Sequence, residues 1–228
     1  MGYDGVEIGV QHLDVTQPEA FRQLVASHGL LPAAIHTGGE IYDPQAVREA
    51  LEKLERTVVF AAQVGAPCLA FSGKLKENRP SEEMALEADN LNRVGQFCKD
   101  NGIRLAYHNH FWEIQNDCRE LQYICDHTDP ALVSLCLDVA WVYRARGNPA
   151  EVARMFLDRV AYFHIKDTTA TEWREVGHGD LDFGALFAVT QPGTREWPWL
   201  VVEQDETQRA PVESARMSRG YLRDKLGV

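Results

Sequence analysis

The 228-residue sequence predicts an α/β fold of the TIM (β/α) barrel type, with seven strand–helix units visible. Short apolar runs alternate with longer amphipathic runs. The spacing from one expected strand to the next is about 25–35 residues, the size of a βα unit. Polar residues gather where successive strands end, as in barrels. The expected strands are Gly5–Val10, Pro32–Thr37, Pro67–Ser72, Ile103–His108, Val133–Val139, Val160–Ile165 and Trp199–Glu203.

The runs between the strands carry helix signals. Helical stretches cover Pro18–His28, Asp43–Val64 and Ser81–Asn101. We expect Thr16 and Asp43 to be N-caps, because Pro18 and Pro44 then fall in the first turn. Helix terminators stand just before the next strand at Gly29, Gly65 and Gly102.

A single barrel domain over residues 1–228 fits better than an open doubly wound sheet. No linker or composition break divides the chain, and no G-x-G-x-x-G follows the first strand, as a dinucleotide-binding sheet requires. A complete barrel has eight units, however. Either the first unit is absent, or a strand escapes detection, or the barrel is incomplete and covered by another subunit in a homo-oligomer.

Composition restricts the partners. A formal net charge of -11 opposes binding to the phosphates of nucleic acids. No apolar run approaches the roughly 20 residues that span a membrane, and no secretion signal opens the chain. We therefore expect a cytoplasmic protein that binds neither nucleic acid nor membrane. The five cysteines lack CxxC spacing, so we expect reduced thiols packed as small apolar side chains.

Four consecutive strands end in residues able to bind a metal. A lone His or Asp at a strand end is more often a hydrogen-bonded capping residue. Four in order, at the same end of different strands, instead indicate one divalent metal ion, since burying such groups unpaired is costly. Mixed imidazole and carboxylate ligands suit Mn, Zn, Co or Fe. The candidates, in order, are His108 and His110; Asp138; His164, Lys166 and Asp167; and Glu203 and Asp205.

The motifs at these positions are similar to those of the xylose isomerase-like TIM-barrel superfamily, which includes sugar isomerases and epimerases, inosose dehydratases and endonuclease IV. The resemblance covers nearly the whole chain and implies a metal held by His108, Asp138, His164 and Glu203. It also implies that Gly-Tyr-Asp-Gly-Val-Glu-Ile is the second strand of the family, so the first βα unit is missing, through a truncated sequence or an open barrel. The matching segments are residues 2–8, 107–110, 137–139, 164–167, 177–183 and 202–205.

The resemblance implies an enzyme that acts on a small-molecule carbohydrate. A sugar, sugar phosphate or cyclitol isomerase or epimerase, working by proton transfer α to a carbonyl, is the family default. Isomerases of the family carry Glu where His108 stands, and Tyr-His-Asn-His is closer to inosose dehydratases, so a dehydratase or lyase is the alternative. A barrel that only binds a ligand is a second alternative. The expected catalytic residues are Glu203, His110 and Lys166, as base or acid.

Five further residues are expected to contact the substrate. Glu7 is a carboxylate inside a strand, and His36 follows the next one. Aromatic faces suit sugar rings, and Trp141 stands where endonuclease IV carries a metal-binding His, which argues against DNA repair. Glu113 is an alternative ligand to His108. The expected substrate-binding residues are Glu7, His36, Trp112, Trp141 and His178.

Overall fold

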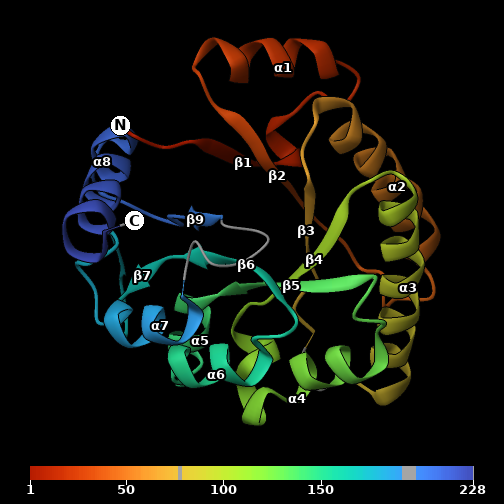
Figure 1. The fold of residues 1–228 in the computed structure, drawn as a ribbon. Helices are drawn as coiled ribbons and strands as arrows, with labels where there is room; N and C mark the ends of the chain where they lie inside the picture. Colours follow the sequence, from red (N-terminus) through yellow and green to blue (C-terminus); the bar gives the residue numbers. More distant parts are fainter. Residues whose placement is uncertain (77–78, 192–198, 228) are drawn as a thin grey trace.

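Seven parallel strands curve into a barrel that stays open along one side, and helices cover its outer surface (Figure 1). The computed structural model of the chain describes residues 1–76, 79–191 and 199–227. The order of the strands in the sheet is β1-β2-β3-β4-β5-β6-β9. They span β1 Gly5–Gly9, β2 Leu31–Gly38, β3 Cys68–Ser72, β4 Arg104–His108, β5 Val133–Asp138, β6 Val160–Ile165 and β9 Leu200–Val202. All seven strands expected from the sequence are therefore confirmed, within one or two residues at each end.

Helices follow the strands, as βα units require. A two-stranded antiparallel hairpin, β7 Asp167–Thr168 and β8 Trp173–Arg174, follows β6 and was not expected from the sequence. No helix in the described residues is both long and apolar enough to cross a membrane. The helices are η1 Val10–His12, α1 Pro18–Ser27, α2 Val47–Val64, α3 Ser81–Asp100, α4 Phe111–His127, α5 Val139–Arg144, α6 Pro149–Phe156, α7 Phe183–Thr190, α8 Pro211–Tyr221 and the π-helix η2 Leu222–Leu226.

Both expected N-caps are wrong, because each side chain serves the turn before its helix. The Thr16 hydroxyl donates to Asp14 Oδ1 at 2.6 Å, and α1 begins after Gln17. The Asp43 carboxylate accepts from the Gln45 amide at 2.8 Å, so that α2 begins only at Val47. The three expected glycine terminators have the positive φ values that end helices, 67° at Gly29, 76° at Gly65 and 73° at Gly102.

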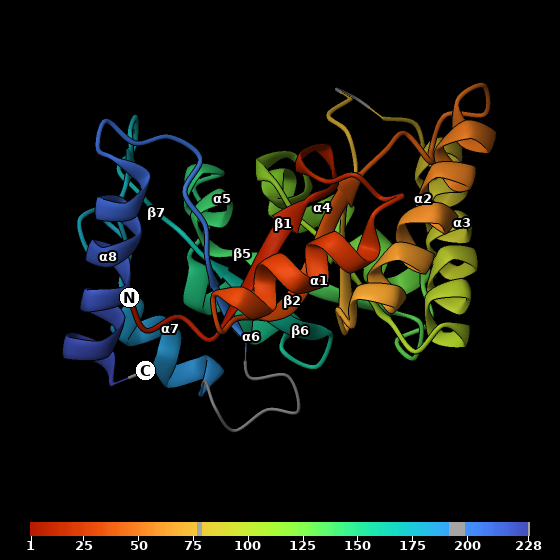
Figure 2. The ribbon, with the colours of Figure 1, turned by 90° about the horizontal axis from the view of Figure 1, so that it is seen from above.

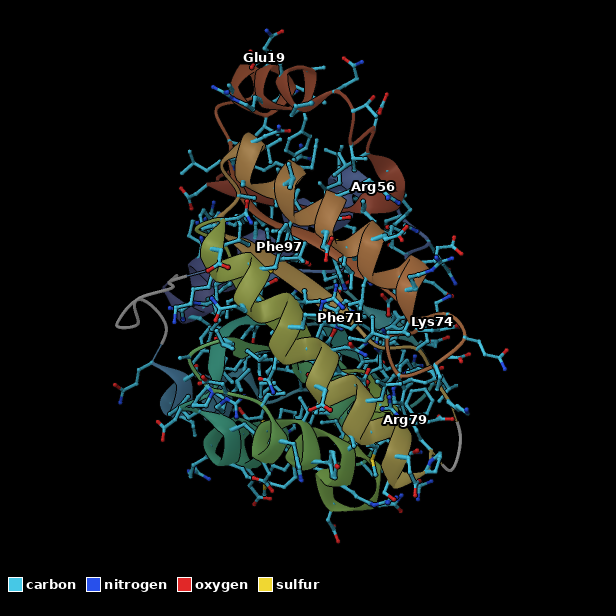
Figure 3. The ribbon with its side chains drawn as sticks, turned by 90° about the vertical axis from the view of Figure 1, so that its right-hand side faces the viewer. Glu19, Arg56, Phe71, Lys74, Arg79 and Phe97 are labelled. Carbon is cyan, nitrogen blue, oxygen red and sulfur yellow. The ribbon has the colours of Figure 1, made fainter. Side chains whose placement is uncertain are left out.

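Alternate strand positions fill two different layers. One set faces the helices and packs large apolar side chains beneath them, as Phe71 of β3 does behind α2 and α3 (Figure 3). The other set faces the barrel interior. Because side chains alternate along a strand, residues two positions later on this inner face lie one layer higher, at the carboxyl ends of the strands. The inner layer is made of Ala34, Cys68, Ala70, Ala106, Cys136, Ala161 and Tyr162. All five cysteines are free thiols, as expected.

The open side of the barrel lies between β1 and β9, which do not pair in the described structure. A cavity of about 730 Å³ separates them, and Trp199 lies against Gly5 across it. The N-terminal segment runs past this gap to α8 (Figure 2), where the Tyr3 hydroxyl donates to the Ala215 carbonyl at 2.9 Å. The expected barrel of seven visible units is confirmed, while its covering by another subunit stays a prediction.

Two helical glycines allow a matched test of how tightly α3 packs. A Cβ at Gly95 would lie 2.6 Å from the Leu132 carbonyl oxygen, whereas a Cβ at Gly220 of α8 would meet no atom within 4 Å. We expect Gly95→Ala to lower the free energy of unfolding by about 1–3 kcal/mol through overpacking. Gly220→Ala should raise it by about 0.5–1 kcal/mol, since alanine favours the helix. Urea unfolding measures both, and a stabilised Gly95→Ala variant would contradict the packing described.

Candidate metal centre

The four residues expected to bind a metal meet at the open mouth of the barrel. His108 ends β4, Asp138 ends β5, His164 lies in β6 and Glu203 follows β9. One potential ligand atom from each lies within 4.8 Å of those of the other three. Parallel strands bring their carboxyl ends to the same rim, and the inward face continues the layer of small residues below. The first three side chains are fully buried, while Glu203 is partly open to solvent.

Asp138 is held from behind, which aims its second oxygen into this cluster. Its Oδ1 accepts from the amides of Ala140 and Trp141 at 2.9 and 3.0 Å, as the N-cap of α5. The buried Asn109 side chain clamps the Asp138 backbone, accepting from its amide at 2.9 Å and donating to its carbonyl at 3.2 Å. Only Oδ2 of Asp138 is left to face the centre of the barrel mouth.

Two buried atoms at the centre make no hydrogen bond among the described residues. They are Nε2 of His108 and Oδ2 of Asp138, which lie 3.5 Å apart, and Oδ2 has the Lys166 ammonium 3.0 Å away as an ion-pair partner. Leaving a buried nitrogen such as Nε2 of His108 unsatisfied costs about 1–3 kcal/mol. A divalent cation between them would accept both lone pairs, and two imidazoles with two carboxylates are a suitable donor set for Mn, Zn, Co or Fe. The residues present therefore fit a metal ion.

Lys166 places a positive charge among the carboxylates of this site. Its Nζ lies 2.8 Å from Glu203, 3.0 Å from Asp138 and 3.1 Å from Asp205. Burial disfavours the charged amine, but the three carboxylates outweigh burial and raise the pKa of Lys166 above its ordinary value. One ammonium faces three carboxylates, so the site keeps an excess of negative charge that suits an additional cation.

Comparison of the chain with known protein families identifies its family. The model of the xylose isomerase-like TIM-barrel family matches residues 1–225. The chain belongs to this family. The resemblance seen in the motifs is therefore confirmed.

Similar proteins in the xylose isomerase-like family have different reactions. An inosose dehydratase from Clostridium perfringens is 30% identical over 178 residues, which cover 69% of this chain and 59% of that protein. The match thus spans less than two-thirds of the relative. A solved sugar phosphate isomerase/epimerase from Parabacteroides distasonis has a TM-score of 0.83 at 21% identity, covering 98% of this chain and 84% of its own. A 3-keto-D-glucoside 4-epimerase from E. coli has a TM-score of 0.80 at 21% identity, covering 97% and 89%. These two structures establish the shared fold.

His110 and three tryptophans form an aromatic wall beside the cluster of this xylose isomerase-like barrel. The His110 ring stacks on Trp112 with centroids 4.4 Å apart and lies 5.5 Å from Trp141. Trp173 of the unexpected hairpin packs edge-on against Trp141 at 4.9 Å. Burial, and then the neighbouring His108, lower the pKa of His110 to about 3, so its imidazole is neutral at pH 7. The neutral ring keeps a nitrogen lone pair that can accept a hydrogen bond from a bound substrate.

The other expected contact residues lie in three different places. Glu7 and His36 form a second group with His164, again with ligand atoms within 4.8 Å. His178 lines a neighbouring polar cavity of about 910 Å³ beyond Trp173, and none of the four clustered residues lines that cavity. Its expected substrate contact stays a prediction. Glu113 turns away from the four clustered residues, His108, Asp138, His164 and Glu203. Its carboxylate accepts from the Tyr107 hydroxyl at 3.0 Å and from the His110 amide at 2.8 Å.

Sequence reasoning did not assign roles to several residues that shape the site. Ser72 ends β3 just as His108 ends β4, and the two are paired in register, so its strand-end position was a usable signal. Asn109 lies inside one of the matched motifs, residues 107–110. Trp173 gave no signal in the sequence, because its position depends on β8, a strand of two residues that is too short to show a pattern.

Glu113 makes the stability of the chain depend on pH. Burial raises the pKa of Glu113 from its ordinary value of 4.5 to about 8. Between those values the unfolded chain has lost the proton that the folded chain retains, so stability falls as pH rises. Glu113→Gln mimics the protonated acid and does not titrate. We therefore expect the unfolding free energy of Glu113→Gln, relative to that of wild type, to increase from pH 5 to pH 8. Urea unfolding across that range, with exposed Glu52→Gln as control, checks this; parallel curves for Glu113→Gln and wild type would contradict it.

Proposed function

We propose that the chain is a metal-dependent isomerase or epimerase that moves a proton α to the carbonyl of a polyhydroxylated ketone or aldehyde. The observation that carries the proposal is the cluster of His108, Asp138, His164 and Glu203 with proton-carrying side chains directly beside it. Membership in a family of sugar isomerases, epimerases and inosose dehydratases supports a carbohydrate substrate.

The four clustered residues would hold the ion, which supplies Lewis-acid polarisation of a substrate oxygen when bound. Around the ion, different residues of the chain would accept and donate protons. Burial opposes the ionised form of Glu203, but His164 and Lys166 lower its pKa well below the ordinary value, so it is a carboxylate able to take a proton. His110, whose ring centroid lies 4.9 Å from that of His108, is the second acceptor. Two acceptors on different strands suit the transfer of a proton between carbons or faces of one substrate.

Lys166 supplies the proton donor. Its ammonium, 2.8 Å from Glu203, can donate to a substrate oxygen that gains charge as the carbon loses its proton. Trp112 and Trp141 give apolar faces that fit the C–H surfaces of a sugar, leaving the hydroxyls to polar groups of the rim. A compact polyhydroxylated substrate, rather than an extended apolar one, is consistent with this surface.

Dehydration is the second candidate, and one local observation favours it. His108 stands where isomerases of the family carry a carboxylate, and the 30% identical relative is an inosose dehydratase. Elimination of water needs one base at the carbon and one acid at the departing hydroxyl. Glu203 and Lys166 lie close enough together to serve those two needs on neighbouring atoms of one substrate.

Hydrogen exchange in deuterated water separates these reactions. We expect protein loaded with Mn²⁺ or Co²⁺ to catalyse exchange at a carbon next to the carbonyl of at least one ketose, aldose or inosose in a panel. NMR detects deuterium incorporated into an isomer or epimer, whereas a dehydratase yields a product that has lost water. Chelator-treated protein should lose the activity. Metal uptake at about one ion per chain with no reaction on any substrate would favour a barrel that only binds a ligand.

A substitution at His110 tests the second acceptor. We expect His110→Gln to slow exchange by about 10²–10⁴-fold, the usual contribution of a general acid–base group. Its metal content should stay at the wild-type level, because His110 lies outside the group of four. Exposed His12→Gln is the control for loss of an imidazole. Full activity in His110→Gln would remove this residue from the proton transfer.

A further inference from the structure

A chain of polar contacts runs around the barrel mouth behind the metal cluster. It begins at Ser72, whose Oγ lies 3.1 Å from Nδ1 of His108 and 2.8 Å from Nε2 of His36. It continues from Nδ1 of His36 to Oε1 of Glu7 at 3.4 Å, its longest step. Four neighbouring strands, β4, β3, β2 and β1, thus contribute one side chain each.

Glu7 collects contacts from the other direction as well. Its Oε1 lies 2.8 Å from Nε2 of His164, and its Oε2 accepts the Tyr162 hydroxyl at 2.7 Å. The Glu7 side chain is only 6% exposed. A buried carboxylate this close to two imidazoles and a phenol is stabilised only if those groups point their protons at it.

The metal cluster decides where those protons stand. His108 presents Nε2 to Asp138, and His164 presents Nδ1 to Glu203 at 2.8 Å. An imidazole nitrogen that binds a metal carries no proton, so the other nitrogen of the ring must carry it. His164 then donates from Nε2 directly to Glu7.

The same rule fixes each proton of the longer branch. His108 donates from Nδ1 to the Ser72 oxygen, so the single Ser72 proton is free for Nε2 of His36. His36, accepting at Nε2, carries its own proton on Nδ1, the nitrogen that faces Glu7. Every donor in the branch has one acceptor, and the branch has only this direction when Nε2 of His108 binds a metal.

We propose that Glu7 is a positioning residue that fixes the tautomers of both histidine ligands, of His164 directly and of His108 through His36 and Ser72. The inference rests on the metal centre of the proposed function. It identifies the residues that hold the two histidine ligands of that centre by hydrogen bonds. Carboxylate partners of this kind raise the basicity of a ligand imidazole and hold its ring orientation.

Glu7, His36 and His164 could be read instead as a second metal site, since their ligand atoms also lie within 4.8 Å. Two observations favour the positioning role. The buried atoms that make no hydrogen bond in the described part of the chain include Nε2 of His108 and Oδ2 of Asp138, but none from these three residues. A second ion would also require both nitrogens of His164 to bind metal, which demands the loss of its last proton.

Two variants of the full chain test the proposal, one that affects both ligand histidines and one that affects His108 alone. Glu7→Gln leaves a single uncharged amide oxygen for the three donors of His36, His164 and Tyr162, whereas Ser72→Ala cuts only the branch to His108. Ser134→Ala, at the other end of β5, makes the same change on a barrel strand away from the rim. Zn²⁺ affinity is measured by competition with a chelator. We expect a loss of about 10–100-fold for Glu7→Gln, a smaller loss for Ser72→Ala and none for Ser134→Ala.

Nitrogen-15 NMR of the histidine rings in the Zn²⁺-loaded protein reads the tautomers themselves. In wild type we expect a proton on Nε2 of His164 and on Nδ1 of His108. Of the two ligand rings, Ser72→Ala should alter only the His108 signals, and Glu7→Gln those of both His108 and His164, a selectivity that general destabilisation does not produce. Unchanged affinity and unchanged tautomers in Glu7→Gln would overturn the positioning role alone. Two Zn²⁺ per chain, falling to one in Glu7→Gln, would replace it by a second metal site. A wild type that takes up no Zn²⁺ would overturn the proposed function together with it.

Discussion

The structure depends on the cost of burying polar side chains at one end of a barrel interior. Below the rim the interior holds small side chains such as Ala70, Ala106 and Cys136, which let seven strands approach closely. One layer higher, the same inward positions carry imidazoles and carboxylates. Each of those groups loses its water on folding, so the layer is stable only as a mutually satisfied network.

The charges within that network are only partly balanced. Lys166 offsets part of the charge of Asp138, Glu203 and Asp205, and Glu7 is satisfied by His164 and Tyr162. What is left over is concentrated between His108 and Asp138, where Nε2 and Oδ2 lie 3.5 Å apart and neither makes a hydrogen bond. The place where the network fails to satisfy itself is therefore the place where a cation fits, and the satisfied remainder holds the ligand atoms still.

The surrounding loops are also organised by single buried acids. Asp167, directly after Lys166, accepts from the amides of Thr168, Gly177 and Gly179 at 2.8–2.9 Å. Gly179 lies so close that a Cβ there would come within 2.2 Å of the Asp167 carboxylate. This packing fixes the segment that follows β6 and so places Trp173 over Lys166, with the amine 5.0 Å from the indole centroid. The aromatic wall of the site thus depends on an acid that lies outside the cluster of His108, Asp138, His164 and Glu203.

The sequence by itself determined the strands and the strand ends at which candidate ligands gather. Apolar runs report burial on both faces of a parallel strand, and residues that end such runs must share one rim, so the candidates at four strand ends could be grouped without coordinates. The choice of His108, Asp138, His164 and Glu203 among them came from the resemblance of the motifs to the xylose isomerase-like family. Only the tertiary structure decided which polar partners each side chain takes. Glu113 turned to Tyr107 rather than to the metal cluster, Asp43 capped a turn instead of α2, and Ser72 joined His36 to His108. Such choices depend on hydrogen-bond distances and angles between residues far apart in the chain, and no local pattern carries them.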